Sequence, residues 1–358
     1  MTRRRGFTRW TLTAALLAAA LVAGCAKHPS APPALAPRTY FMGFSGIPPR
    51  PELPIALQAI AMWSTRADAA LVLNEPPWDS LLAGTRADSL VMRQQLPAAL
   101  YLRALGKRIV ASLDPTNGLD RSSDSAPLVA AGRSLTEPAI RQLYRNYAVA
   151  LDTLLHPDYL SLASETNLVR AAAPAGLYAA MVQNAAEAAA AVRAVDPAVK
   201  LYTTVQVEVA WGRLVPASGY QGIAQDRSDF PFDQALGLSS YPYLAGYTDP
   251  DSLPGDYYTR LVQGSPLPLL VIEGGWTSHD VGGVVSTPDV QRRYLTRQAG
   301  LLDAAAAVGW FQITFTDLDL NVYPAGVAPF AWLGLVDVNL AAKPALAAWD
   351  AEFARPRH

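Results

Sequence analysis

Short apolar runs alternate with longer helix-like segments from about residue 39 to the end of the chain, and this alternation constrains the fold more than any other feature. Runs with the length and composition of buried strands lie at 40–47, 69–73, 108–113, 159–163, 199–207, 235–239, 267–272 and 309–315. Helix-like segments lie at 54–63, 86–105, 137–155, 175–195, 289–307 and 344–353. Eight strand–helix units in about 320 residues predict a single (β/α)8 barrel, in which 211–230 is mostly loop.

The seventh apolar run ends in an acidic residue. Leu267 to Ile272 is typical of a strand buried on both faces, and Glu273, two glycines and Trp276 follow it. The carboxyl ends of barrel strands carry the active-site loops, so Glu273 falls where such a fold places its chemistry. The alternative interpretation is a structural glutamate that caps a helix or pairs with an arginine.

Acids, amides and aromatic residues follow the other predicted strands as well. The candidate substrate contacts are Glu75, Trp78, Asp114, Asn167, Gln206, Glu208, Tyr241, Tyr243, Trp276, Trp310, Asp317 and Trp332. Sugars need many hydrogen-bond partners for their hydroxyls and flat rings for their C–H faces. This set of residues therefore predicts a carbohydrate site, although any one tryptophan alone is more often part of a core.

Two segments resemble known glycosidases. The segment 237–243, GLSSYPY, resembles the sixth-strand segment of the endo-β-1,4-galactanase family and its relatives. The pieces 309–310 (GW), 332–337 (WLGLVD) and 343–345 (KPA) together resemble the ending of glycoside hydrolase clan A. The resemblance implies a retaining (β/α)8 enzyme with an acid/base glutamate after strand four and a nucleophilic glutamate after strand seven. By strand count these are Glu165 and Glu273, with Glu273 ionised and Glu165 holding a proton. Tyr241 is a candidate to hydrogen-bond Glu273, and packing against the barrel rim is its equally good alternative.

The sequence departs from the clan pattern at one position. The clan usually has asparagine before the acid/base glutamate, and here that residue is Ser164, so either Ser164 or Asn167 serves or the contact is missing. The sequence Asn–Glu–Pro at 74–76 spells the motif literally, but it follows the second strand. We therefore prefer Glu165 to Glu75 as the acid/base residue.

The N-terminus has the pattern of an export signal. Four arginines within the first nine residues precede an apolar run at 10–22, which is too short to span a bilayer comfortably. The sequence 21–25, LVAGC, closely resembles a bacterial lipobox, and Cys25 is the only cysteine. These features predict a signal peptide at 1–24, a lipidated Cys25 with a Pro/Ala-rich tether at 25–38, and a barrel at 39–358. The expected location is the bacterial cell envelope, in the outer membrane if the cell is Gram-negative.

Composition narrows the functional classes. The formal net charge of −1, with no basic patch after the first nine residues, argues against nucleic-acid binding. The four histidines are scattered, so we expect no metal site and no cofactor, and we expect a monomer. The favoured function is a retaining glycoside hydrolase acting on a β-linked oligo- or polysaccharide. The alternatives are a non-catalytic carbohydrate-binding lipoprotein on a decayed barrel and, less favoured, a barrel enzyme of other chemistry such as a metal-dependent hydrolase.

Overall fold

The computed structural model describes residues 35–358, of which Pro37–His358 form one compact unit. The predicted signal peptide, Cys25 and most of the tether lie outside the described residues. Within residues 35–358, no helix has the length and apolar character needed to cross a membrane.

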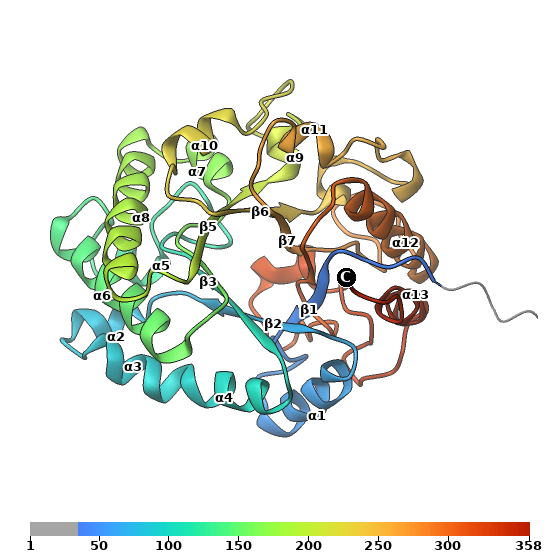
Figure 1. Cartoon of the computed structure of the whole chain (residues 1–358), viewed down its shortest axis with the longest axis horizontal. Coiled ribbons are helices and arrows are strands. Elements are labelled where there is room, and N and C mark those ends of the chain that lie inside the picture. The colour runs from blue at the N-terminus through green and yellow to red at the C-terminus, as the bar shows by residue number, and fades with distance from the viewer. Residues whose placement is uncertain (1–34) are drawn as a thin grey trace, which may run out of the picture. The chain divides into compact units, whose positions relative to one another are not determined.

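Eight parallel strands form a closed barrel in chain order, and β8 pairs with β1 to complete it (Figure 1). The strands are β1 (Phe41–Ser45), β2 (Ala69–Asn74), β3 (Arg108–Leu113), β4 (Tyr159–Ser161), β5 (Lys200–Gln206), β6 (Ala235–Ser240), β7 (Leu269–Gly274) and β8 (Gly309–Gln312). Seven of the eight lie within a predicted run or differ from it by one residue, and β7 ends two residues beyond the predicted run. The predicted (β/α)8 barrel is confirmed.

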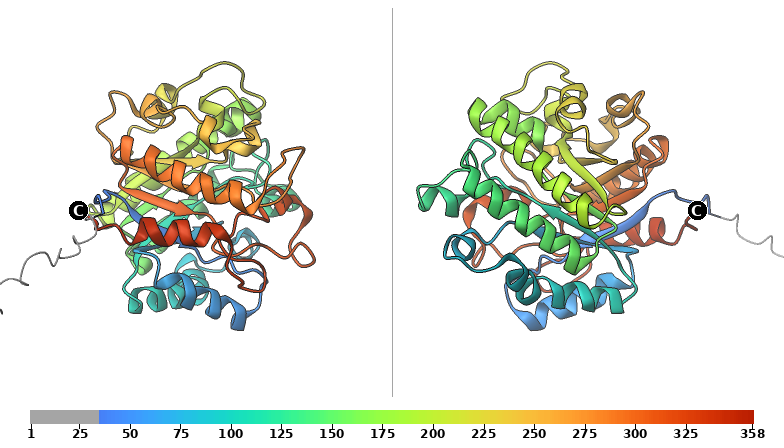
Figure 2. Two further views of the ribbon diagram at one scale, coloured as in Figure 1. Left: turned by 90° about the vertical axis from the view of Figure 1, so that its right-hand side faces the viewer. Right: turned by 60° about the vertical axis from the view of Figure 1, so that its left-hand side comes forward.

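Helices surround the strands on the outside of the barrel (Figure 1). They are α1 (Leu53–Ser64), α2 (Trp78–Leu82), α3 (Ala87–Gln94), α4 (Leu96–Ala104), α5 (Ala126–Ala130), α6 (Pro138–Leu155), α7 (Thr166–Ala172), α8 (Ala175–Val195), α9 (Val207–Ala210), α10 (Ala224–Asp229), α11 (Thr259–Val262), α12 (Pro288–Ala304) and α13 (Pro344–Phe353), with 3-10 helices η1 (Pro242–Ala245), η2 (Pro250–Ser252) and η3 (Ala325–Phe330). Helices α6 and α8 pack side by side, as do α12 and α13 (Figure 2).

The helix pattern differs from the prediction inside one long segment, and the short helices α2, α5, α7, α9 and α11 were not predicted. The single helix predicted at 86–105 is two helices, α3 and α4, which meet at Gln95. Pro97 lies in the first turn of α4, where its missing N–H is tolerated, whereas inside a continuous helix it would remove a hydrogen bond. The segment 211–230, predicted to be mostly loop, contains only the short helix α10.

Two sets of buried residues alternate along the strands. Phe41, Tyr159 and Tyr202 belong to the smaller cluster, while neighbours of the opposite parity, such as Met42 and Leu160, belong to the larger cluster. Because successive side chains on a strand point to opposite faces, the smaller cluster fills the barrel interior and the larger one packs strands against helices. The interior is therefore solid, and a site has to lie above it at the strand ends.

The backbone around the end of β7 needs glycine. Gly274 and Gly275 have φ angles of 154° and 152°. A Cβ on Gly274 would lie 2.4 Å from the Ser240 carbonyl oxygen, and a Cβ on Gly275 would lie 2.6 Å from Gln312 Nε2. The two glycines thus let β7 approach β6 and β8 closely directly after Glu273.

A register shift then sets the neighbours of Glu273. Leu238 pairs with Val271, but the next residue, Ser239, pairs with Glu273, so β7 contributes one extra residue at this point. This irregularity brings the Ser239 and Glu273 side chains together.

Candidate active site

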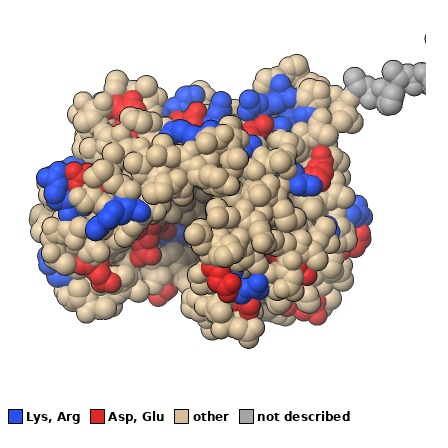
Figure 3. Space-filling view, turned by 90° about the horizontal axis from the view of Figure 1, so that it is seen from below, with Lys and Arg blue, Asp and Glu red and all other residues tan. Residues whose placement is uncertain are grey.

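A cavity of about 790 Å³ lies at the carboxyl ends of the strands. Residues that follow β1 to β6 and β8 line it, together with Glu273 in β7. Figure 3 shows a hollow in the molecular surface with acidic and basic side chains inside it. This is the end of the barrel at which the sequence placed the chemistry.

The Ser239 hydroxyl joins two carboxylates in this cavity. Its Oγ lies 2.6 Å from Oε1 of Glu165 and 2.9 Å from Oε1 of Glu273. The two carboxylate oxygens cannot be farther apart than the sum of these distances, about 5.5 Å. The hydroxyl has one hydrogen, so it donates to only one of them, and the other bond requires a proton on the second carboxyl group.

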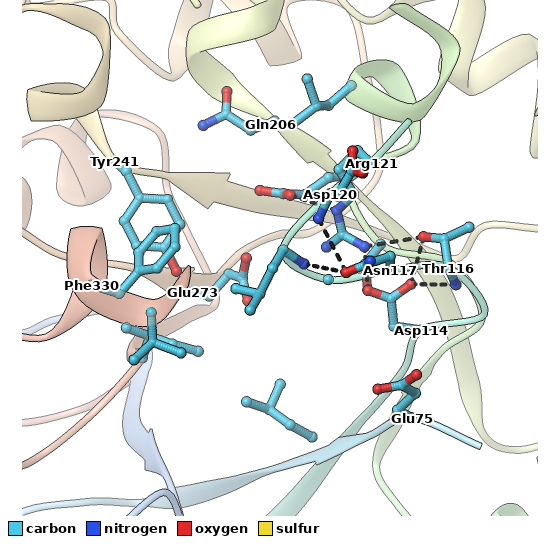
Figure 4. A pocket seen from close by; sticks show the side chains of 18 of the residues that line it. Glu75, Asp114, Thr116, Asn117, Asp120, Arg121, Gln206, Tyr241, Glu273 and Phe330 are labelled. Carbon is cyan, nitrogen blue, oxygen red and sulfur yellow. Dashed lines mark hydrogen bonds and ion pairs between the residues drawn. The ribbon is translucent and has the colours of Figure 1, made fainter. Parts of the chain in front are cut away.

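A buried arginine lies on the far side of Glu165. Nε of Arg121 is 2.9 Å from Oε2 of Glu165, and the same guanidinium pairs with Asp114 and donates to Thr116. Arg121 belongs to the loop between β3 and α5, and Figure 4 shows it beside Asp114 and Thr116. Sequence reasoning missed Arg121, because an isolated arginine inside a polar loop has no distinguishing pattern.

Glu165 occupies an unusual backbone conformation. Its φ and ψ are 47° and 48°, the left-handed region that non-glycine residues rarely adopt. Its N–H donates to Thr204 Oγ1 at 2.8 Å, and its carbonyl accepts from the first turn of α7. The strained conformation is held from both sides, as is common where a side chain must be aimed precisely into a site.

The surroundings of Glu273 favour its protonated form. Burial raises the pKa of Glu273 to about 7, and the charge of Glu165 adds to this effect, while Arg121 and the hydrogen bond from Ser239 oppose it. Within residues 35–358, Glu165 is ion-paired with Arg121 and Glu273 has no ion pair. The raised pKa of Glu273 runs against its expected ionised form.

The structure brings part of the predicted substrate set to the cavity. Glu75, Asp114, Gln206 and Tyr241 line it together with the two glutamates. The residues that do not line it are Trp78, Asn167, Glu208, Tyr243, Trp276, Trp310, Asp317 and Trp332. A position at a strand end therefore identified the right end of the barrel but not the direction of each side chain.

Two predicted acids have structural partners instead. Glu208 is completely buried, and each of its carboxylate oxygens accepts two hydrogen bonds. Ser240 Oγ and Tyr257 Oη donate to Oε1. The Tyr241 N–H and Gln206 Nε2 donate to Oε2. Asp317 is buried against Lys343, with Nζ 2.7 Å from Oδ1. The Lys–Pro–Ala sequence that begins α13 therefore has a structural role, since its lysine neutralises a carboxylate of the β8 loop.

The tryptophans lie away from the cavity. Trp78, Trp276 and Trp310 are fully buried, and the Trp310 ring packs 4.8 Å from that of Trp349. Trp332 is partly exposed but packs 4.5 Å from the His279 ring. None of the predicted tryptophan platforms faces the pocket.

The structure distinguishes between the two substitutes for the missing asparagine. Ser164 lines the cavity, whereas the Asn167 amide exchanges two hydrogen bonds of 2.8 Å with the backbone of Gln206. Tyr241 has no hydrogen bond to Glu273 among the described residues, and its ring packs 5.0 Å from Phe330. The packing interpretation of Tyr241 is thus the one the geometry favours.

Glu75, the literal motif match, lies at the pocket wall. Its carboxylate accepts a hydrogen bond from the Ser125 hydroxyl. No group of three or more metal-ligating side chains occurs in the described part of the chain.

Comparison with known proteins gives fold likenesses only. No protein-family model and no curated protein sequence matches the chain. Among solved structures, an exo-β-1,4-mannosidase from Opitutaceae bacterium strain TAV5 superposes with a TM-score of 0.66 at 17% identity, covering 89% of this chain and 59% of the mannosidase. A β-D-glucuronidase from Dictyoglomus thermophilum gives 0.59 at 11%, covering 90% and 51%.

A GH53 catalytic domain from Ignisphaera aggregans gives a TM-score of 0.56 at 17% identity, covering 89% of this chain and 92% of that domain. The chain thus spans about half to three-fifths of the mannosidase and glucuronidase but nearly all of the GH53 domain. The protein has the (β/α)8 barrel fold found in these glycoside hydrolases, as its resemblance to clan A predicted.

Proposed function

We propose that the protein is a retaining glycoside hydrolase that cleaves a β-linked substrate by double displacement. The observation that carries this proposal is the Ser239 bridge, which limits the nearest oxygens of Glu165 and Glu273 to about 5.5 Å. Retaining enzymes hold their two carboxyl groups about 5–5.5 Å apart, whereas inverting enzymes need about 6.5–9.5 Å to admit a water molecule. This separation supports retention rather than inversion.

The reaction assigns one glutamate to each role. In the first step a Glu273 oxygen bonds to the anomeric carbon while the glycosidic bond breaks, and Glu165 gives its proton to the leaving oxygen. In the second step Glu165 takes a proton from water, the water oxygen bonds to the anomeric carbon, and the bond to Glu273 breaks. These roles follow the strand positions of the two residues.

The Ser239 hydroxyl offers a route by which a proton can reach Glu165, where the first step needs it. The raised pKa of Glu273 favours a proton on that residue, and Arg121 is ion-paired with Glu165. If Arg121 withdraws, Glu273 can pass its proton to Ser239 Oγ while the Ser239 hydroxyl proton passes to Glu165. The result is an ionised nucleophile and a protonated acid with no change in total charge.

The structural neighbours support a β-linked substrate. The mannosidase is titled exo-β-1,4-mannosidase, and several others are titled β-glucuronidases. A non-catalytic sugar-binding protein is the less favoured alternative, because a binding site does not require two carboxylates around one hydroxyl. We further propose the cell-envelope location and the acyl anchor at Cys25.

A panel of aryl β-glycosides, followed by NMR of the first-formed sugar, tests the proposal. We expect hydrolysis with the β-anomer formed first, and no turnover in Glu273→Ala. Formation of the α-anomer first would contradict the retaining mechanism. Sugar binding without hydrolysis of any glycoside would favour the non-catalytic alternative.

A further inference from the structure

We propose that the natural substrate carries an apolar, alkyl-type leaving group, so that the pocket holds one sugar at its base and a hydrocarbon chain at its mouth. The inference rests on the proposed glycosidase function and specifies its substrate class. It replaces the oligo- or polysaccharide expected from the sequence.

The cavity is divided by polarity. The two glutamates, Arg121 and Gln206 are buried or nearly so, and they surround the place where a sugar would react. The loops around them contribute mainly aliphatic side chains, which are Ile47, Leu119, Leu168, Leu214, Val215, Leu244, Leu318 and Val327. A molecule that reaches from the glutamates to the solvent therefore meets a polar zone and then an apolar one.

Two of these aliphatic side chains are strongly exposed. Val215 is 84% exposed and Leu119 is 55% exposed, although both line the cavity. Exposed apolar surface gathered at the entrance of a pocket usually marks a surface that an apolar ligand covers. Their placement on the β5 and β3 loops puts apolar surface on two different walls.

The polar residues at the mouth have partners within their own loop. Asn117 Oδ1 accepts from the N–H groups of Leu119 and Asp120, and Asp120 Oδ1 accepts from the N–H and hydroxyl of Ser122. These side chains stabilise turns of the β3 loop (Figure 4). The Oδ1 atoms of Asn117 and Asp120 are thus already engaged within the loop.

Aromatic platforms are also few. Of the described residues that line the cavity, only Tyr241 and Phe330 are aromatic, and they form one edge-to-face pair, 5.0 Å apart. Figure 4 shows both on the side of the pocket next to Glu273. One such wall can support one sugar ring, whereas a bound polysaccharide would need further rings along its path.

Two loops meet at one end of the mouth. A Cβ built on Gly326 would lie 3.2 Å from Cδ1 of Leu119, so the β8 loop touches the β3 loop. These loops follow strands separated by β1 and β2 in the barrel, so they approach each other across the ends of those two strands. Their approach leaves less room for a chain of sugars to extend past the glutamates.

The test compares β-glycosides of one sugar with linear alkyl leaving groups of one to eight carbons, all kept below the concentration at which they form micelles. We expect kcat/KM to rise about two- to fourfold for each added methylene until the mouth is filled. Phenyl and benzyl glycosides distinguish a flexible chain from a flat aromatic leaving group, and the disaccharide and trisaccharide of the same sugar are measured beside them.

Val215→Ser should flatten the dependence on chain length. Val285→Ser is the matched control, because Val285 is 70% exposed but does not line the cavity, and it should keep the wild-type dependence. Leu119→Ser tests the wall formed by the β3 loop in the same way.

Hydrolysis that is independent of chain length, or a preference for the trisaccharide over the octyl glycoside, would overturn this inference while leaving the glycosidase function intact. Failure of every glycoside to react would instead refute the proposed function. In that case calorimetric binding of the alkyl series to the unmodified protein decides the inference, and equal affinity across the series would refute it too.

Discussion

Replacing Glu273 with glutamine should stabilise the folded protein, by an amount that grows with pH. Burial and the nearby charge of Glu165 raise the pKa of Glu273 from 4.5 to about 7. Because the folded-state pKa lies above the unfolded value, the wild-type protein has the full benefit of the protonated group below about pH 4.5 and loses it as the pH rises through 7. Glutamine stays neutral throughout.

The magnitude follows from the gap between the two pKa values. The two pKa values differ by about 2.5, and each pKa unit corresponds to about 1.36 kcal/mol, so the effect is at most about 3.4 kcal/mol. Glu273 borders the open cavity and is partly exposed, so solvent screening should reduce the measured value to about 2 kcal/mol. The benefit should develop between about pH 4.5 and 7 and remain constant above that.

Urea unfolding of wild type and Glu273→Gln at pH 4.5, 6, 7 and 8.5 measures this effect. The relevant quantity is how the difference in unfolding free energy between the two proteins changes with pH. Any cost of the amide that does not depend on pH cancels in that change. Glu208→Gln is the control: glutamine would turn its NH₂ toward two donors, so we expect a loss of about 1–3 kcal/mol at pH 7. If the difference in unfolding free energy between Glu273→Gln and wild type does not change with pH, the proposed electrostatics of the pair are refuted.

Three further predictions concern other parts of the chain. In Glu165→Ala, substrates with good leaving groups should still form the glycosyl-enzyme, and azide should restore turnover with retained configuration; wild-type rates on an alkyl glycoside would exclude Glu165 as the acid. Lys343→Met should lower the unfolding free energy by about 3–5 kcal/mol, because it leaves Asp317 buried without its cation, and unchanged urea unfolding would contradict that role. Cys25→Ser should move the protein from the membrane to the soluble fraction, and retention after carbonate extraction would refute the lipid anchor.

The order of strands and the positions of Glu165 and Glu273 could be predicted because both depend on local pattern. Apolar runs of strand length mark the barrel, and an acid directly after such a run must lie near its carboxyl end. Gly274 and Gly275 were also visible as a turn, although the close approach of β6 and β8 that requires them was not.

The partners of the two glutamates could not be predicted. The Ser239 bridge depends on the register shift between β6 and β7, which no sequence period shows. Arg121 reaches Glu165 through the path of a loop, 44 residues earlier in the chain. Both contacts are set by tertiary structure.

The aromatic lining was predicted poorly for a related reason. Trp276 and Tyr243 do follow strands, but each side chain turns into the packing between strand ends and helices rather than into the cavity. A large ring is stabilised most by complete burial, so core packing determines its direction unless a ligand site competes.

Trapping of the glycosyl-enzyme tests the central claim most directly. A 2-fluoro-β-glycoside with a good leaving group, incubated with the protein and followed by proteolysis and mass spectrometry, identifies the residue that bonds to the anomeric carbon. We predict a fluoroglycosyl ester on the peptide containing Glu273. An ester on Glu165 would show that the two glutamates have exchanged roles. Efficient hydrolysis of the parent glycoside with no trapped residue, together with an inverted product, would contradict the double-displacement mechanism.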